Sequence, residues 1–158
     1  MGKLMKIVIS PYSRPMRNGA KNPKNFPHWK PLVKKLISLG HEVVQIGAKG
    51  EEKIIGDCLF GLPFDAVKKL ITEADLWISV DNFLPHLANH TPTRGIVIFG
   101  KSDPNIYGYP QNVNILKDRK YLREKQFDIW EAEFFEADVF VGVDEVLEAI
   151  KLLTEEKV

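Results

Sequence analysis

Three loops of this sequence contain hydroxyl, amide, carboxylate, imidazole and cationic side chains that could bind a ligand. The candidate binding residues are Ser13, Arg14 and Lys24 in the first loop, Asp81, Asn82 and His86 in the second, and Lys101 and Ser102 in the third. Hydroxyl, guanidinium and ammonium groups gathered beside a helix N-terminus suit a diphosphate, because each donates hydrogen bonds to anionic oxygens. The residue types therefore predict a local anion site, and they identify no catalytic residue.

Short apolar runs precede all three loops and predict buried strands. The predicted strands are Met5–Ile9, His41–Gly47, Cys58–Phe60, Leu76–Val80, Gly95–Gly100 and Val113–Leu116. They alternate with helical patterns, which is typical of βαβ units and a parallel sheet. We therefore predict an α/β fold, a single Rossmann-like domain over residues 1–158 with helices on both faces of the sheet. The expected strand order is 3-2-1-4-5, and a sixth strand could lie beyond the fifth.

The helical patterns are apolar on one face only. From Trp29, the apolar residues recur at positions i, i+3, i+4, i+7 and i+8, and Gly40 predicts a left-handed cap at the end of that helix. We interpret this apolar stripe as core. Further helices are expected over Pro63–Ala74, around Leu84–Asn89 and from Val143 onward. Because ligands of open parallel sheets bind outside the carboxyl ends of the strands, the three polar loops should converge on one cleft.

Each candidate residue also has a purely structural interpretation. Asp81 or Asn82 could simply cap the helix that contains Pro85, and a lone His86 is more often packed or solvated than functional. The stretch from Gly100 to Pro104 is a good turn by itself. The chain has neither a GxxxxGK[ST] loop nor a GxGxxG motif after the first strand, which excludes a P-loop and the ordinary dinucleotide fingerprint.

Composition narrows the class of protein. The 158 residues are 44% hydrophobic and 27% charged, with a net charge of +1, which are ordinary globular values. The one cysteine, Cys58, cannot form an intrachain disulfide, and we interpret it as a buried apolar residue. We expect no metal and no cofactor, since no Cys/His cluster has ligand spacing. With no apolar run of about 20 residues and no secretory leader, we also expect no membrane span and a cytoplasmic location.

Two segments have a biased composition, a basic loop at 12–27 and an aromatic tail at 117–140. The tail residues Tyr121, Phe127, Trp130, Phe134 and Phe135 predict that this segment packs onto the domain. Its basic stretch consists of Lys117, Arg119, Lys120, Arg123 and Lys125. We interpret that stretch as a solvated face, so nucleic acid is an unlikely partner.

The block from Asp75 to Pro104 resembles the C-terminal, nucleotide-sugar-binding half of the ADP-heptose:lipopolysaccharide heptosyltransferases, which are glycosyltransferases of the GT-B fold. Their block runs D-[ST]-G-x-x-H-L-A, then a T-P-T step, then a strand ending F-G-x-[ST]-x-P. The matching residues are Asp81, His86, Leu87, Ala88, Thr91, Pro92, Thr93, Phe99, Gly100, Ser102 and Pro104. Upstream, Lys24 to Leu36 resembles the family's K-x-W-P-x-x-x-W-x-x-L entry to a helix, so the resemblance covers roughly residues 6–109.

The resemblance implies roles for several residues. Ser13 and Lys24 would reach the diphosphate, the backbone after Asp81 would cradle it, and Asp81 and His86 would lie near the donor sugar. The chain departs from the pattern at Asn82-Phe83, where the family has Thr or Ser followed by Gly. Family members also have an N-terminal domain that holds the acceptor and the catalytic carboxylate, and we expect this chain to correspond to the other half.

Two functional hypotheses follow. The first is a heptosyltransferase-like glycosyltransferase, or the donor-binding subunit of one, with a second domain or chain supplying the acceptor site. The second is a non-catalytic module that binds or sequesters a nucleotide or nucleotide-sugar. Glu131, Glu133 and Glu136 are the candidate bases within the tail.

Overall fold

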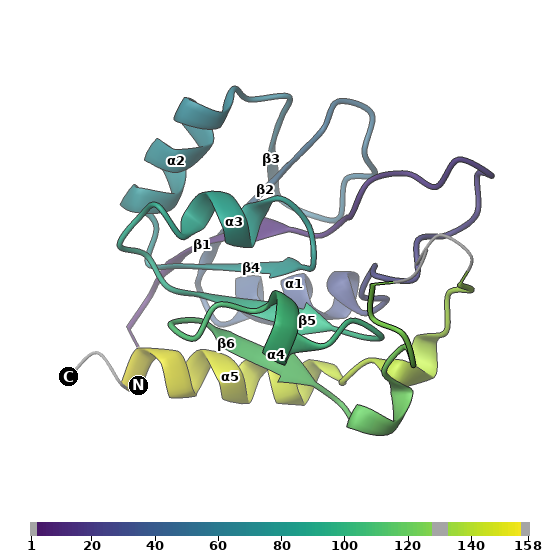
Figure 1. Ribbon diagram of the computed structural model, residues 1–158. Helices are drawn as coiled ribbons and strands as arrows, with labels where there is room; N and C mark the ends of the chain where they lie inside the picture. The colour runs from purple at the N-terminus through teal and green to yellow at the C-terminus, as the bar shows by residue number, and fades with distance from the viewer. Residues whose placement is uncertain (1–2, 128–132, 156–158) are drawn as a thin grey trace.

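The computed structural model describes residues 3–127 and 133–155, which form one parallel sheet flanked by helices (Figure 1). The strands are β1 (Lys6–Ser10), β2 (Glu42–Gly47), β3 (Asp57–Phe60), β4 (Leu76–Val80), β5 (Gly95–Phe99) and β6 (Val113–Leu116). Their order is β3-β2-β1-β4-β5-β6, and each neighbouring pair is parallel. The predicted order is confirmed, including the sixth strand.

Helices cover both faces of this sheet, as predicted. They are α1 (Trp29–Ser38), α2 (Phe64–Glu73), α3 (Leu84–Ala88), α4 (Pro104–Tyr107) and α5 (Val143–Glu155), with short 3-10 turns η1 (Arg119–Tyr121) and η3 (Ala137–Val139). Helices α1 and α5 lie on one face, and α2 and α3 lie on the other (Figure 1). Every residue of β4 and β5 is buried, which explains why these strands are continuously apolar in sequence.

Helix α1 forms where the apolar stripe predicted it. Trp29, Leu32, Val33 and Leu36 are buried against the sheet, whereas Ile37 lies at the edge of the stripe and is 41% exposed. The helix ends at Ser38 and is capped by Gly40, whose φ of +93° is the left-handed conformation that favours glycine. The Gly40 and His41 amides bond back to the carbonyls of Ile37 and Leu36, so this cap turns the chain directly into β2.

The core on the α2–α3 face is built around Trp77. This side chain is fully buried, and its indole N–H donates to the Thr93 carbonyl at 3.0 Å. The ring lies against Gly95 on the neighbouring strand β5, in space that a Cβ at Gly95 would occupy. The glycine in β5 is therefore required by close packing rather than by its backbone angles.

One sequence prediction about burial was wrong, and another was confirmed only in part. Cys58 is only partly buried, because β3 is an edge strand; its Sγ lies 3.8 Å from Oε1 of Gln45. In the tail, Phe127 and Phe134 are 84% and 81% exposed, although Tyr121 and Phe135 do pack against the core. Trp130 lies outside the described residues. Polar contacts, described below, hold this tail in place together with the packing of the Tyr121 and Phe135 rings.

The described helices include none that is both long enough and apolar enough to cross a membrane.

Candidate functional site

A cleft of about 530 Å³ opens at the carboxyl ends of β1 and β4. Six of the eight candidate residues line it, namely Ser13, Arg14, Lys24, Asp81, Asn82 and His86. The loop after β1 and the loop after β4 supply all six, because β1 and β4 are neighbours at the point where the strand order reverses. The remaining two candidates, Lys101 and Ser102, do not line this cleft.

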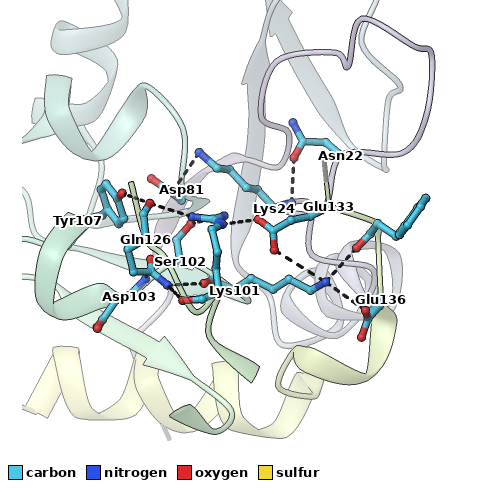
Figure 2. Close-up of polar contacts among 12 residues, drawn as sticks. Asn22, Lys24, Asp81, Lys101, Ser102, Asp103, Tyr107, Gln126, Glu133 and Glu136 are labelled. Carbon is cyan, nitrogen blue, oxygen red and sulfur yellow. Dashed lines mark hydrogen bonds and ion pairs between the residues drawn. The ribbon is translucent and has the colours of Figure 1, made fainter. Parts of the chain in front are cut away.

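An ion pair joins the two main walls of the cleft. The Lys24 ammonium lies 3.2 Å from a carboxylate oxygen of Asp81, and their side chains are only 19% and 13% exposed (Figure 2). Two asparagines hold the loop that presents Lys24. Asn22 accepts from the Lys24 amide at 2.9 Å and donates to the Arg14 carbonyl at 2.7 Å, while Asn25 accepts from the Ser13 amide at 2.8 Å. The basic loop is therefore ordered around the pair.

Asn82 has a structural function in this arrangement. Its side-chain amide donates to the Ser10 carbonyl and hydroxyl and to the Tyr12 carbonyl, at 3.0–3.2 Å. Its side-chain oxygen accepts from the Leu84 amide at 2.9 Å, at the start of α3. Asn82 thus ties the end of β1 to the end of β4. The next residue, Phe83, has ordinary helical angles (φ −68°, ψ −29°), so the departure from glycine carries no backbone strain.

Lys101 and Ser102 lie behind the Lys24–Asp81 pair, around a cavity of about 10 Å³ that is no larger than one water molecule. Ser102 is 3% exposed, and its hydroxyl accepts from the Arg123 guanidinium at 3.3 Å. The Lys101 ammonium pairs with Glu136 at 3.1 Å and lies 3.9 Å from Glu133 (Figure 2). These two residues therefore lie outside the cleft and line the small cavity together with Lys24 and Asp81.

The tail is fixed to the turn after β5 by a polar network (Figure 2). Arg123 donates to Glu133 as well as to Ser102. Gln126 donates to the Lys101 carbonyl at 3.0 Å and accepts from the Asp103 amide at 2.8 Å. Residue types alone do not indicate this network, because its contacts to the turn after β5 join residues 21 to 25 positions apart in the chain.

These contacts also account for the basic stretch of the tail. Arg119 forms a bidentate pair with Asp103, at 3.1 and 2.8 Å, and its hydrogen bond holds the pKa of Asp103 below the usual value. Lys117 donates to the Asp138 carbonyl, and Lys120 lies over the Tyr121 ring. Four of the five cations of the basic stretch therefore make contacts within the chain.

Two of the three candidate bases of the tail also form ion pairs within the chain. Glu133 accepts from Arg123, and Glu136 pairs with Lys101. Glu131 lies outside the described residues.

Sequence reasoning missed two residues of the cleft, Tyr12 and Glu51. Glu51 follows β2, so its loop lies at the same carboxyl edge of the sheet as the others. That position in the sequence is the signal by which Glu51 could have been identified. One oxygen of its carboxylate is buried without a hydrogen-bond partner, against Gly47, and burial raises the pKa of Glu51. Burial and the carboxylates of Glu52 and Glu51 raise the pKa of Tyr12 to about 12, so its phenol stays a hydrogen-bond donor at neutral pH.

The raised pKa of Glu51 predicts how stability depends on pH. A carboxyl whose pKa is raised by folding stabilises the protein fully below the unfolded-state pKa of about 4.3, and that contribution is lost as pH rises through the folded-state pKa. We expect Glu51→Gln to raise the melting temperature at pH 7 and to leave it unchanged below about pH 4. Thermal melts across this range test the prediction, with Glu52→Gln as the matched control. A melting temperature lowered at pH 7 would contradict it.

An apolar recess of about 430 Å³ adjoins the cleft and shares Ala48 and Phe83 with it. Three of its apolar side chains are unusually exposed, Leu59 (43%), Phe64 (66%) and Phe83 (37%). The rings of Phe64 and Phe83 are stacked, with centroids 6.0 Å apart and an interplanar angle of 30°. A polar cleft continued by an apolar, aromatic recess is the usual composition of a small-molecule site.

Comparison with solved structures identifies proteins with a similar fold. ADP-heptose lipopolysaccharide heptosyltransferase II of E. coli is 20% identical, with a TM-score of 0.67, over 97% of this chain and 47% of that chain. A glycosyl transferase family 9 protein from Veillonella parvula DSM 2008 is 17% identical, with a TM-score of 0.74, over 97% and 46%. The dodecameric iron-containing heptosyltransferase TibC, from enterotoxigenic E. coli H10407, is 18% identical, with a TM-score of 0.69, over 100% and 47%. The chain thus spans about half the length of each structure.

Comparison with curated proteins gave no significant match. The model of glycosyltransferase family 9 (heptosyltransferase), in contrast, matches residues 6–128. That range covers most of the chain and includes every residue that lines the cleft. The chain therefore belongs to glycosyltransferase family 9, the heptosyltransferase family.

Proposed function

We propose that the chain forms a single domain that binds a nucleoside diphosphate sugar at the carboxyl edge of its sheet, as the donor-binding part of a glycosyltransferase. The observation that carries the proposal is the convergence of Ser13, Arg14 and Lys24 with Asp81 and His86 on one cleft. Cationic and hydroxyl donors face carboxylate and imidazole groups across it. This combination suits a ligand that has both a phosphate and a sugar.

Lys24 is the proposed diphosphate ligand. Its ammonium is a compact point charge of the kind that binds phosphate, and it is held at the cleft by the pair with Asp81. A diphosphate that approaches Lys24 also approaches the carboxylate of Asp81, so Lys24 would turn from Asp81 toward the phosphate. Asp81 would then accept hydrogen bonds from sugar hydroxyls.

The rest of a nucleotide fits the neighbouring features. The carboxylate of Glu51, which lines the cleft, can accept a hydrogen bond from a ribose hydroxyl, and the apolar recess can take the base against Phe83. A second structure of TibC is in complex with ADP-D-β-D-heptose, which makes ADP-heptose the first donor to test.

Removing the Phe83 ring should weaken nucleotide binding without affecting the phosphate site. Base–aromatic stacking contributes about 1–3 kcal/mol, so we expect Phe83→Ala to raise the Kd for ADP about 5- to 150-fold. Its effect on inorganic diphosphate should be within about twofold, because that ligand has no base to stack. Calorimetric titration of both ligands tests this, with Ile106→Ala as a control, since Ile106 is also exposed but lies outside the recess. Equal losses for both ligands would place the base elsewhere.

Ligand screening tests the proposed function directly. We expect nucleoside diphosphates and their sugars to raise the melting temperature of the chain more than nucleosides do. A ligand at about 100 times its Kd adds about 2.7 kcal/mol of stability. If no member of a panel of nucleosides, diphosphates and nucleotide-sugars stabilises the chain, the proposal is wrong.

Transfer of the sugar needs a second binding surface. Positioning an acceptor against the donor can lower the barrier by about 7–11 kcal/mol, and a base is also required. Because the chain spans about half the length of the related structures, we propose that a second domain or chain supplies that surface. The alternative is a non-catalytic module that captures a nucleotide or nucleotide-sugar. It is supported by the ion pairs that two candidate bases, Glu133 and Glu136, form within the chain.

We expect the 158-residue chain, as a monomer, to bind its nucleotide-sugar and transfer no sugar to an external acceptor at ordinary rates. The measurement is turnover of the best-binding nucleotide-sugar by the purified chain, with its oligomeric state determined in parallel. Acceptor-dependent turnover of about 1 s⁻¹ or more by a monomer would show that the chain needs no second domain.

A further inference from the structure

A tyrosine outside the predicted site contacts the histidine of the cleft. His86 lies on α3 and is exposed, and its Nδ1 is 2.8 Å from the phenol oxygen of Tyr109. The two rings also pack edge to face, with centroids 5.5 Å apart and an interplanar angle of 76°. Tyr109 is part of the connection between α4 and β6, so the contact joins α3 to that connection.

The backbone around Tyr109 is fixed by its own contacts. The Tyr109 carbonyl accepts from the Asn114 side chain at 3.0 Å and from the Asn112 amide at 3.1 Å. The preceding residue, Gly108, has no room for a side chain, because a Cβ there would lie 2.6 Å from the Pro104 carbonyl and 2.8 Å from the Asn114 side chain. The phenol is thus presented to His86 from a closely packed turn.

We propose that Tyr109 is a positioning residue that makes His86 a hydrogen-bond donor to the bound sugar. In the proposed arrangement the phenol O–H is the donor in the 2.8 Å contact with Nδ1. A neutral imidazole that accepts at Nδ1 carries its proton on Nε2. Nε2–H is then the ring position left to bind an oxygen of a ligand in the cleft. In this state His86 donates a hydrogen bond and does not act as a general base. The role at the sugar rests on the proposed function, whereas the His86–Tyr109 hydrogen bond does not.

The first experiment measures the ring nitrogens of His86 by NMR in the ligand-free chain. In neutral His86 we expect a protonated Nε2 and a hydrogen-bonded Nδ1, and we expect Tyr109→Phe to move the Nδ1 resonance downfield. Tyr107→Phe is the matched control, since its hydroxyl donates to the Gln126 carbonyl instead. A protonated Nδ1 in the wild-type chain, or a His86 spectrum unchanged by Tyr109→Phe, would overturn the proposal.

The second experiment compares the affinities of ADP and ADP-D-β-D-heptose. A net hydrogen bond changes affinity about 2- to 10-fold, so Tyr109→Phe should weaken ADP-heptose binding by this factor and leave ADP binding unchanged. Equal weakening of both ligands, or none, would overturn the role at the sugar. If the wild-type chain binds neither ligand, it is the proposed function that fails, and the NMR result still decides the His86–Tyr109 contact.

Discussion

Replacing Lys24 by methionine is expected to raise the Kd for ADP about 10- to 100-fold, because a hydrogen bond to a charged group contributes about 1.5–3 kcal/mol. The same substitution should leave adenosine binding within about twofold, since adenosine has no phosphate for the ammonium to contact. Methionine keeps the length and much of the apolar stem of lysine, so the loss reports the charge rather than the volume. Calorimetric titrations of ADP and adenosine give both values.

The Lys24 substitution has a matched control in the same loop. Lys21 lies over the Phe135 ring, 4.3 Å from its centroid, and does not line the cleft. We expect Lys21→Met to bind ADP as the wild-type chain does. Equal losses from the two variants would indicate a general effect of net charge, and an equal loss of ADP and adenosine from Lys24→Met would indicate a disturbed loop. Either result would contradict the assignment of Lys24 as a phosphate ligand.

Replacing Trp77 by alanine is expected to lower the free energy of unfolding by about 3–5 kcal/mol, the usual cost of truncating a buried tryptophan. The side chain is fully buried, and its loss also leaves the Thr93 carbonyl without the indole N–H. Denaturation by urea, followed by circular dichroism, gives the change. If Trp77→Ala does not fold, Trp77→Phe provides a milder reduction of the same volume.

Because Trp77 and Gly95 are in contact, the effects of substitutions at these two positions on the free energy of unfolding should be non-additive. Gly95→Ala in the wild-type chain should cost about 1–3 kcal/mol or more, because the added Cβ collides with the ring. In the Trp77→Ala or Trp77→Phe background the added methyl enters space that the ring has vacated, so the same substitution should cost clearly less. Strict additivity of the two changes would contradict this account of the core.

The fold could be predicted from the sequence because its strongest signals are local. The continuous apolar runs of β4 and β5 predict buried parallel strands, and the glycine at position 40 predicts the end of α1. The parallel order then brings the loops of Lys24 and Asp81 together, since carboxyl ends of neighbouring strands meet at one edge.

The parts that could not be predicted depend on long-range polar contacts. Ser102 accepts a hydrogen bond from Arg123, which is 21 residues away in the chain, and neither residue type indicates the other. Tyr109 is likewise brought to His86 by the turn after α4. Glu51 lies after β2 at the same edge of the sheet, but its residue type alone does not indicate a place in the cleft.

The most direct test of the account is the location of the bound nucleotide-sugar. Titration of the ¹⁵N-labelled chain with ADP-D-β-D-heptose should perturb backbone amides of residues 12–25, 47–51 and 81–86, which belong to the loops around the cleft. A second cavity, of about 600 Å³, lies between α1 and α5 at the opposite edge of the sheet and is lined by Met5, Leu36 and Leu147. Saturable changes confined to the loops of the cleft are the predicted result, whereas changes confined to the α1–α5 cavity, or no saturable change, would contradict it.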